Sequence, residues 1–301
     1  MSNALVVSVI LNTNRRADTL ECLASLARQT HARQHVIMLD NASTDGSPEA
    51  VRAQFPYVEL VGLTDNQGYA GNNNVGIKLA LERGADWVFV LNEDTVLDPG
   101  CLAGLIAQGE ADSKVGIVGP LVYHHDDKDV IQSAGGEMNK HLESWHRGQN
   151  QKDAGQFAQP MQSDWISGCA ILVRRTVIEQ IGMLDARFFY YWEEVEWCLR
   201  ARKAGWRIVL APAAQLWHKG VQQNYQPKPS VTYYGTRNRL MMLQKHRVPV
   251  STWLVTWSQL GRTLASWTLK PQWRDKRGHR DAMWRGMVDF VAGRHGRGRP
   301  A

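Results

Sequence analysis

The stretch that decides the fold runs from Trp87 to Gly100 and reads WVFVLNEDTVLDPG. Its apolar residues, Val88 to Leu91, lead without interruption into Asn92, Glu93 and Asp94. A short unbroken apolar run is typical of a strand that is buried on both faces, as in a parallel sheet. Because adjacent carboxylates repel each other, a pair at the end of such a strand indicates either a positive charge between them or a reaction that needs them.

The sequence before this strand alternates between strand and helix patterns. Apolar runs at 5–11 and 35–40 predict two more buried strands, and apolar residues at helical spacing predict helices over 16–29 and 68–84. This alternation predicts an α/β fold with a mostly parallel, Rossmann-like sheet flanked by helices. The sequence has neither the GxGxxG signature of dinucleotide oxidoreductases nor a P-loop, which disfavours both of those enzyme classes.

Polar residues follow three of the predicted strands. The clusters are Thr13-Asn14-Arg15, Asp40 to Asp45, and Asn92-Glu93-Asp94. Each cluster alone could be an ordinary turn or a solvated loop. However, ligands of parallel α/β sheets bind outside the carboxyl ends of the strands. Three clusters at that edge therefore predict a ligand site.

A second group of acids follows a run of aromatic residues. Phe188 to Trp192 are all aromatic, and Glu193, Glu194 and Glu196 come directly after them. Acidic residues in the first turn of a helix suit the helix dipole, which is a purely structural explanation. That explanation does not account for the aromatic run, which would shield the carboxylates from water and raise their pKa.

Most of the positive charge lies at the C-terminal end. The chain has a formal net charge of +6, and residues 244–301 alone hold 12 Lys and Arg against three Asp. Apolar residues recur there at helical spacing: Trp253, Trp257, Leu260, Leu264 and Trp267, then Met283, Met287, Phe290 and Val291. Basic helices with such stripes commonly lie in a membrane interface. Packing against the rest of the chain and a homodimer contact are the alternatives. No nucleic-acid-binding module accompanies the charge, so we expect no nucleic-acid partner.

Cysteine usage and the N-terminus indicate a cytoplasmic protein. The four cysteines are scattered, without a CxxC pair, and predict reduced thiols. The N-terminal residues lack the pattern of a signal peptide, and no window has the roughly 18 apolar residues that a membrane span needs. We therefore expect a cytoplasmic location, with the C-terminal stripe as a peripheral contact to the inner membrane.

Six segments, in this order along the chain, resemble the family 2 glycosyltransferases of GT-A fold, and most closely the bacterial rhamnosyltransferase-like branch. They read VSVILNTNRR (7–16), MLDNASTDGS (38–47), GYAGNNNVGI (68–77), VLNEDTVLDPG (90–100), FFYYWEEVEWCLR (188–200) and APAAQLWHKG (211–220). YYGTRNRLMML (233–243) also resembles a segment that follows the catalytic core in this branch.

The resemblance implies an inverting transferase that moves a sugar from a nucleotide diphosphate, UDP or dTDP and possibly dTDP-rhamnose, to a hydroxyl group. The acceptor would be a saccharide or a lipid-linked saccharide of a cell-surface polysaccharide. A divalent cation, Mn²⁺ or Mg²⁺, would neutralise the leaving diphosphate. A carboxylate in an apolar pocket would remove the proton of the attacking hydroxyl. The alternatives are a nucleotide-sugar-binding protein that has lost catalysis and, among enzymes, a sugar-1-phosphate nucleotidyltransferase, whose Gly-rich loop is missing.

The resemblance also assigns residue roles. Asp94 stands in the metal motif, His218 at a position that serves the metal or the diphosphate, and Glu194 at the position of the base. Asn92 replaces an acid and would bind the ribose, while Asp40 and Thr13 would bind the nucleobase. The other residues expected at the donor site are Asn14, Arg15, Asn41, Asn73, Asn74 and Glu93.

We expect residues 1–225 to form the catalytic domain and residues 226–301 to form a helical, amphipathic and basic extension. Within the catalytic domain, the nucleotide-binding half would be 1–100 and the acceptor-side half 101–225. Residues 137–164 show no clear periodicity, and they are either an acceptor-facing insertion or a plain surface excursion.

Overall fold

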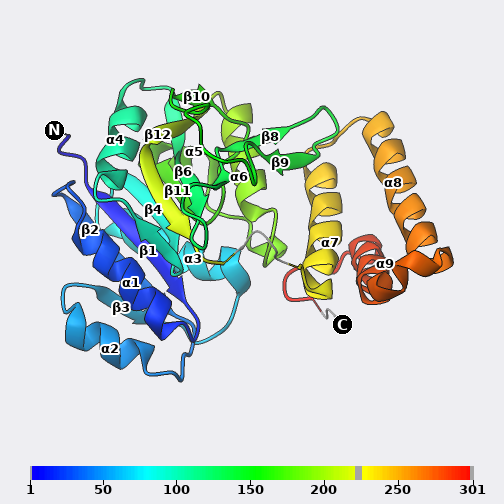
Figure 1. Ribbon diagram of the computed structural model, residues 1–301, viewed down its shortest axis with the longest axis horizontal. Coiled ribbons are helices and arrows are strands. Elements are labelled where there is room, and N and C mark those ends of the chain that lie inside the picture. Colours follow the sequence, from blue (N-terminus) through cyan, green and yellow to red (C-terminus); the bar gives the residue numbers. More distant parts are fainter. Residues whose placement is uncertain (1, 221–225, 299–301) are drawn as a thin grey trace.

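The computed structural model describes residues 2–220 and 226–298. In these residues ten strands form one sheet that helices cover on both faces, and α7, α8 and α9 stand together at one end of it (Figure 1). The order along the main path of the sheet is β10-β12-β6-β11-β4-β1-β2-β3, with β5 added to β12 and β7 to β6. The predicted α/β fold is confirmed.

The first half of the chain forms the parallel part of the sheet. β1 pairs with β2 and β4, and β2 pairs with β3, all in parallel. The predicted strands and helices are all present, with one further helix and strand between them. In order, the elements are β1 (Val6–Asn12), α1 (Arg16–Ala27), β2 (Gln34–Asp40), α2 (Ser47–Gln54), β3 (Glu59–Gly62), α3 (Gly68–Glu82) and β4 (Trp87–Asn92).

The second half extends this sheet with mixed pairing. β11 lies antiparallel between β4 and β6, and β12 pairs with β6 in parallel. The elements of the sheet and its covering helices are β5 (Thr95–Leu97), α4 (Cys101–Glu110), β6 (Val115–His124), β7 (Ile131–Ser133), β10 (Met161–Gln162), β11 (Ala170–Arg174), α5 (Arg175–Ile181), the 3₁₀ turn η1 (Ala186–Phe188), α6 (Glu193–Lys203) and β12 (Arg207–His218).

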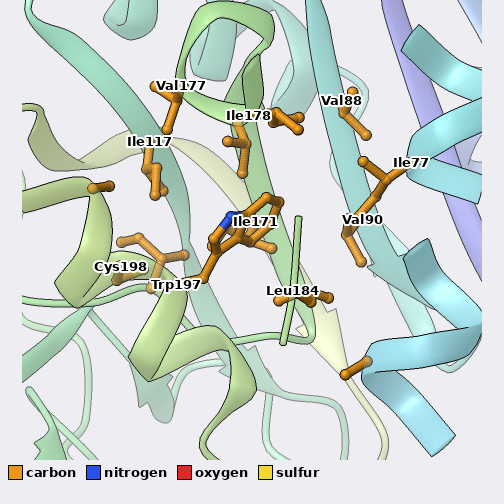
Figure 2. Close-up of a cluster of buried hydrophobic side chains, with 14 of the residues drawn as sticks. Ile77, Val88, Val90, Ile117, Ile171, Val177, Ile178, Leu184, Trp197 and Cys198 are labelled. Carbon is orange, nitrogen blue, oxygen red and sulfur yellow. The ribbon is translucent and has the colours of Figure 1, made fainter. Parts of the chain in front are cut away.

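Two apolar layers cover the two faces of the sheet. Successive side chains of a strand point to opposite faces, and β1 follows this rule. Val7 and Val9 contribute to one cluster, and Val6 and Ile10 to the other. Figure 2 shows part of the first cluster, where Trp197 of α6 packs over side chains of the sheet and of α5. Burial on both faces explains why these strands have continuous apolar sequences.

The segment 137–164 contains a small hairpin. β8 (Gly136–Met138) and β9 (Ser144–His146) pair in antiparallel fashion as a separate two-stranded sheet. The hairpin reaches toward the C-terminal helices (Figure 1), and its Glu143 accepts a hydrogen bond from Gln259 at 2.6 Å. The segment thus joins the sheet to the C-terminal region. Whether it faces an acceptor stays a prediction.

The C-terminal region is helical, as predicted. It comprises α7 (Pro229–Lys245), α8 (Val250–Leu269), the short turn η2 (Pro271–Lys276) and α9 (Arg277–Val291). Part of the predicted apolar stripe packs within the chain, because Trp253 stacks on Phe290 with 5.9 Å between ring centroids. In the described residues no helix is long and apolar enough to cross a membrane.

α7 packs against the α/β body. Its Met241 and Met242 belong to the larger apolar cluster of the sheet, although we assigned this helix to the extension. The boundary at residue 225 stays a prediction. The four cysteines are free thiols and buried, in agreement with the sequence interpretation.

Candidate active site

A cleft of about 420 Å³ opens at the carboxyl ends of β1 and β4. Many of the predicted donor-site and metal residues line it: Thr13, Arg15, Asn41, Asn92, Glu93, Asp94 and His218. The sheet brings them together because β1 pairs with β4, so that Leu11 lies opposite Asn92. The edge at which the three polar clusters were expected to converge is therefore the edge that carries the cleft.

Asp94 and His218 meet because the chain reverses direction after β4. Thr95 of β5 lies opposite His218 of β12, which places the preceding Asp94 beside the imidazole. Asp94 Oδ1 lies 3.1 Å from His218 Nε2, and neither atom has a hydrogen-bond partner among the described residues. His218 Nδ1 lies 2.8 Å from the side-chain oxygen of Gln132, which fixes the ring. These two buried atoms need either a hydrogen between them, carried by the imidazole nitrogen, or a divalent cation.

These two side chains suit a divalent cation that also binds a substrate. Carboxylate oxygen and imidazole nitrogen both bind Mn²⁺, and Mg²⁺ usually has one or two carboxylates plus substrate phosphates as ligands. Among residues 2–220 and 226–298 no group of three or more His, Cys, Asp or Glu side chains could hold a metal ion. A cation here would therefore take its remaining ligands from the diphosphate and from water.

Arg15 supplies a positive charge beside the adjacent acids Glu93 and Asp94. Its Nη1 lies 3.3 Å from Asp94 and its Nε 3.7 Å from Glu93. Burial and the Asp94 charge raise the pKa of Glu93 to about 7. Burial also works against ionisation of Asp94, but His218 and Arg15 reverse that shift, and the net pKa of this carboxyl lies below its ordinary value. Positive charge beside the pair thus holds Asp94 as a carboxylate.

Asp40 links the end of β1 to the loop that follows β2. It is buried, and its carboxylate accepts hydrogen bonds from Asn12 Nδ2 at 2.9 Å and from the amide of Ser43 at 3.0 Å. Asn41 and Thr13, which line the cleft, are joined by a 3.2 Å hydrogen bond. Asp40 itself is not among the lining residues, so its contact with a nucleobase stays a prediction.

Asn14 shapes the loop after β1. It adopts the left-handed conformation with φ of 52°, and its side chain accepts a hydrogen bond from the Thr44 amide at 2.7 Å. This contact fastens the loop after β1 to the loop after β2. The structure therefore gives Asn14 a role in shaping the site, while Arg15 and Thr13 reach the cleft.

On α3, the cleft is lined by Asn72 and Tyr69 and not by the expected Asn73 and Asn74. The side chain of Asn74 exchanges hydrogen bonds with the backbone of Leu184 at 2.8 and 3.0 Å, and Asn73 donates to the Tyr69 carbonyl at 2.9 Å. Successive helical residues point about 100° apart, so that the three asparagines face three directions. The segment GYAGNNNVGI (68–77) contains Asn72, but the sequence alone does not show which of its asparagines faces the cleft.

Phe189, Tyr190 and Tyr191 form one side of the cleft, here called the aromatic wall. Phe189 and Tyr191 have positive φ angles of 64° and 69°, a conformation that non-glycine residues seldom adopt. The side chain of Asn238 on α7 donates to the carbonyl oxygens of Tyr190 and Tyr191, both at 2.8 Å, and its amide also lies 2.7 Å from the Phe188 carbonyl. Asn238 belongs to the segment YYGTRNRLMML (233–243), and this segment therefore holds the aromatic wall in its strained shape.

The three glutamates of α6 have different surroundings. Glu196 is fully buried and pairs with Arg200 at 2.9 Å, as its spacing predicted, and also with Lys245 at 2.9 Å. Glu193 is buried, and one of its oxygens has no partner in the described chain. Burial raises the pKa of both Glu193 and Glu194, and in Glu193 the charge of Glu194 adds to the shift. These acids differ from Glu196, whose partners lower its pKa.

Glu194 does not line the cleft but lies next to it. A Cβ added to Gly168 would lie 3.5 Å from Glu194 Cγ and 3.3 Å from the Tyr69 hydroxyl. Tyr69 donates that hydroxyl to the Gly168 carbonyl at 2.5 Å, and it lines the cleft. Gly168 thus has Glu194 and Tyr69 as neighbours, which places Glu194 next to a residue that lines the cleft.

Curated relatives point to sugar transfer in glycan synthesis. The N-acetylglucosaminyl-diphospho-decaprenol L-rhamnosyltransferase of Mycobacterium tuberculosis (strain ATCC 25618 / H37Rv) is 30% identical over 246 residues, 74% of this chain and 79% of that protein. The dTDP-rhamnosyl transferase RfbF of Shigella flexneri is 24% identical over 256 residues, 82% of this chain and 83% of that protein.

Solved structures and a family model agree with this. The mannosyltransferase PcManGT from Pyrobaculum calidifontis, in complex with GDP-Man and Mn²⁺, is similar with a TM-score of 0.61 and 15% identity, over 97% of this chain and 88% of that one. S. aureus TarS 1–349 has the same TM-score and identity, over 96% of this chain and 82% of that one. Residues 8–182 match the model described as Glycosyl transferase family 2. This chain therefore belongs to glycosyltransferase family 2 and is a glycosyltransferase of GT-A fold that acts in glycan biosynthesis.

Proposed function

We propose that the protein transfers a sugar, with inversion, from a dTDP- or UDP-linked donor to a hydroxyl of a saccharide or lipid-linked saccharide. dTDP-rhamnose is the first donor to test, because two curated relatives are named as rhamnosyltransferases. The observation that carries the proposal is the Asp94–His218 pair with its two unpartnered atoms, in a cleft that Asn41, Thr13 and Asn92 also line. These groups suit a nucleoside diphosphate bound with a divalent cation.

The chemistry is divided between two groups of residues, the Asp94–His218 pair and Glu194. Asp94 and His218 would hold Mn²⁺ or Mg²⁺, which neutralises the charge of the diphosphate when bound. Glu194 takes the proton of the acceptor hydroxyl. The acceptor oxygen then forms the new bond to the anomeric carbon while the bond to the diphosphate oxygen breaks, and the diphosphate leaves with the electron pair. A base and a leaving group on opposite faces of the sugar give inversion.

The basic C-terminal region has a place in this proposal. A lipid-linked acceptor would bring the enzyme to a membrane surface, and α8 exposes Val250 by 73% and Leu254 by 67%. We therefore include a peripheral membrane contact through this region. Sedimentation with anionic liposomes at low and high salt tests it. If the full-length protein does not sediment with liposomes even at low salt, the exposed apolar side chains would instead form a homodimer contact.

The proposal is tested by a thermal-shift screen of UDP-, GDP- and dTDP-sugars with Mn²⁺ or Mg²⁺, followed by donor turnover. A ligand that binds only the native state raises the melting temperature. We expect the shift to require the metal and to disappear in EDTA. Binding without turnover in the presence of acceptor sugars would instead support a chain that binds the donor without transferring the sugar.

Asp94→Asn gives the matched test of the metal site. The variant keeps the size of the side chain but loses the charged oxygen that faces His218. We expect calorimetry to show that Mn²⁺ no longer strengthens donor binding, while the melting temperature without ligand stays close to that of the parent. Full activity of this variant, or of the parent in EDTA, would exclude a metal role for Asp94.

A further inference from the structure

A second cavity, of about 780 Å³, lies between α7, α9 and the segment that follows α9. The predictions made from the sequence did not include it. Its lining is strongly basic and partly aromatic: Tyr233, Arg237, Trp284, Arg285, Val288, Asp289, Arg294, His295, Arg297 and Gly298. Four arginines thus surround one acidic side chain, and we call this cavity the basic pocket.

The charge of the basic pocket is only partly compensated within the described chain. Asp289 pairs with Arg294 at 3.1 Å and accepts the hydroxyl of Tyr233 at 2.6 Å. Arg237 is fully buried and forms no ion pair within the described residues, although its guanidinium donates to Asn238, the Tyr233 hydroxyl and the Phe188 carbonyl. Arg285 and Arg297 are exposed, and neither pairs with a carboxylate among residues 2–220 and 226–298, so both are free to bind an anion that enters the pocket.

The pocket is built into the fold. The segment after α9 turns back along α7, where the Gly298 amide donates to the Tyr234 hydroxyl at 3.0 Å. The amide of Gly296 donates to the carbonyl of Arg187 at 2.8 Å. These contacts fix the arginines of the segment against the α/β body.

An apolar surface continues from the pocket along α9. Trp284, Val288 and Val291 follow one another at i, i+4 and i+7 and are 57%, 41% and 74% exposed. This spacing places them on one face of the helix. Apolar side chains beside arginines suit an amphiphile whose anionic head enters the pocket and whose apolar chain lies along α9.

Side chains of α7 connect the basic pocket to the aromatic wall of the cleft. Phe189 lines the cleft and stacks on Tyr234 with 5.6 Å between ring centroids. Arg237 lines the pocket and donates to the carbonyl of Phe188 at 3.2 Å. Neighbouring side chains of α7 thus contact the aromatic segment on one side and the basic pocket on the other.

We propose that the basic pocket binds the phosphoryl group of a lipid-phosphate or lipid-diphosphate acceptor, with the start of its apolar chain on Trp284 and Val288. This inference rests on the proposed function, because it assumes an acceptor that carries the sugar hydroxyl to the cleft. Arginine is suited to this task, since its planar guanidinium forms paired hydrogen bonds with phosphate oxygens.

Calorimetry with the full-length protein tests the proposal, with geranyl diphosphate, inorganic diphosphate and geraniol as probes. We expect geranyl diphosphate to bind most tightly, inorganic diphosphate more weakly, and geraniol least. Arg285→Gln and Arg297→Gln should each weaken both diphosphates about tenfold or more, the usual effect of one lost charged hydrogen bond. Trp284→Ala should weaken geranyl diphosphate and leave inorganic diphosphate unchanged.

Arg262→Gln is the matched control, because it removes the same charge from exposed α8, outside the pocket. If it weakens the diphosphates as much as Arg285→Gln does, the binding is a general effect of net charge and the proposal is wrong. Binding to anionic vesicles without binding of geranyl diphosphate would overturn it in favour of a membrane-surface contact. Donor binding is measured on the same samples, so a parent that binds donor but not geranyl diphosphate disproves this inference alone.

Discussion

Glu193 and Glu194 are adjacent in the sequence, yet their carboxylates face different surroundings. Glu193 is buried with an unpartnered oxygen, and Glu194 is half-buried beside Gly168 and Tyr69. Only a group that an acceptor can reach can take its proton. The structure thus gives Glu194 the better access, in line with its position in the family motif.

We expect Glu194→Gln to lower kcat by about 10²–10⁴-fold, the usual contribution of a positioned base, with donor affinity close to that of the parent. Glu193→Gln is the neighbouring control and should retain turnover. Steady-state kinetics and donor calorimetry on both variants decide between them. If turnover is lost only in Glu193→Gln, then Glu193 is the base and our assignment of Glu194 is wrong.

The pH dependence follows from the same carboxyl. Burial raises the pKa of Glu194, and a base acts only when it is ionised. Activity should therefore increase with pH through a titration that lies above the ordinary pKa of glutamate. This step should be missing from the residual activity of Glu194→Gln. A parent profile that is flat down to the ordinary glutamate pKa would contradict a raised pKa in the working enzyme.

Several of the site residues could be predicted because each of them ends a strand. Asp94 comes shortly after an unbroken apolar run, and strand ends in a parallel sheet meet at one edge. His218 was assigned from the family resemblance, because Gln215 interrupts the apolar residues before it. Asn72 could not be separated from Asn73 and Asn74, because the sequence does not show how a helix is rotated on its sheet. Gln132, which fixes His218, lies on a three-residue strand that carries no pattern of its own.

At the scale of the element, α7 shapes the cleft, mainly through the side chain of Asn238. Asn238 holds the carbonyl oxygens of the aromatic wall, whose backbone is strained at Phe189 and Tyr191. Strained residues of this kind persist only where the surroundings hold them. α7 therefore supports the wall of the cleft as well as being part of the helical region.

Asn238→Ala should lower the free energy of unfolding by about 1–3 kcal/mol and raise the KM for the donor, because buried carbonyls lose their donor and the wall relaxes. Asn238→Asp has the same size and should be worse, since it places a negative charge against the same carbonyl oxygens. Denaturant titration and initial-rate kinetics measure the two effects. An unchanged KM in both variants would show that the wall does not depend on α7.

Glu196 ties α6 to α7. It is fully buried and pairs with Arg200, Lys245 and His246. Burial raises its pKa, but these partners outweigh burial and lower it overall. A carboxyl with a lowered pKa in the folded state adds stability above its unfolded pKa, and this stability is lost as the pH falls through the folded value.

We expect Glu196→Gln to lower the free energy of unfolding by about 3 kcal/mol at pH 7, because Arg200 and Lys245 lose their buried carboxylate partner. The difference from the parent should shrink as the pH is lowered into the acidic range. Glu179→Gln breaks an exposed pair with Arg175 and should cost about 0.5 kcal/mol. Denaturant titrations at several pH values compare the two, and equal effects would mean that burial adds nothing to the Glu196 pairs.

Long or strongly patterned elements could be predicted, and short or non-local ones could not. β1, β2, β4 and α3 were predicted from the sequence because burial on two faces or amphipathic spacing marks them directly. β8 and β9 have three residues each, too few for a period to be visible. Their pairing depends on a neighbouring strand, which the local sequence does not specify.

At the scale of the whole molecule, α9 packs against α7, and α8 packs against α9 (Figure 1). Trp253 stacks on both Trp257 and Phe290, so part of the predicted apolar stripe is used between these helices. Six large apolar side chains of the two helices stay exposed, and of these only Val291 belongs to the predicted stripe: Val250, Leu254, Leu269, Trp284, Val288 and Val291. The extension thus has an inner surface that packs within the chain and an outer surface that stays exposed.

Two truncations test where the catalytic domain ends. A chain ending at Arg247 keeps α7, and with it Met241, Met242 and the contacts of Asn238 to the aromatic wall. It loses α9, which covers Tyr233 through Asp289. We therefore expect this chain to fold and bind donor with a lower melting temperature, and to lose geranyl-diphosphate binding because the basic pocket is gone.

A chain ending at residue 225 loses α7 as well. Removing one large side chain from a core costs about 2–5 kcal/mol, and here Met241, Met242 and Leu240 all leave a buried position. Glu196 also loses Lys245 and His246. Because domains are stable by only about 5–15 kcal/mol, this chain should show no cooperative melting by circular dichroism and no donor binding. If it instead melts cooperatively and binds donor like the parent, then residues 1–225 are the complete catalytic domain and α7 belongs to the extension.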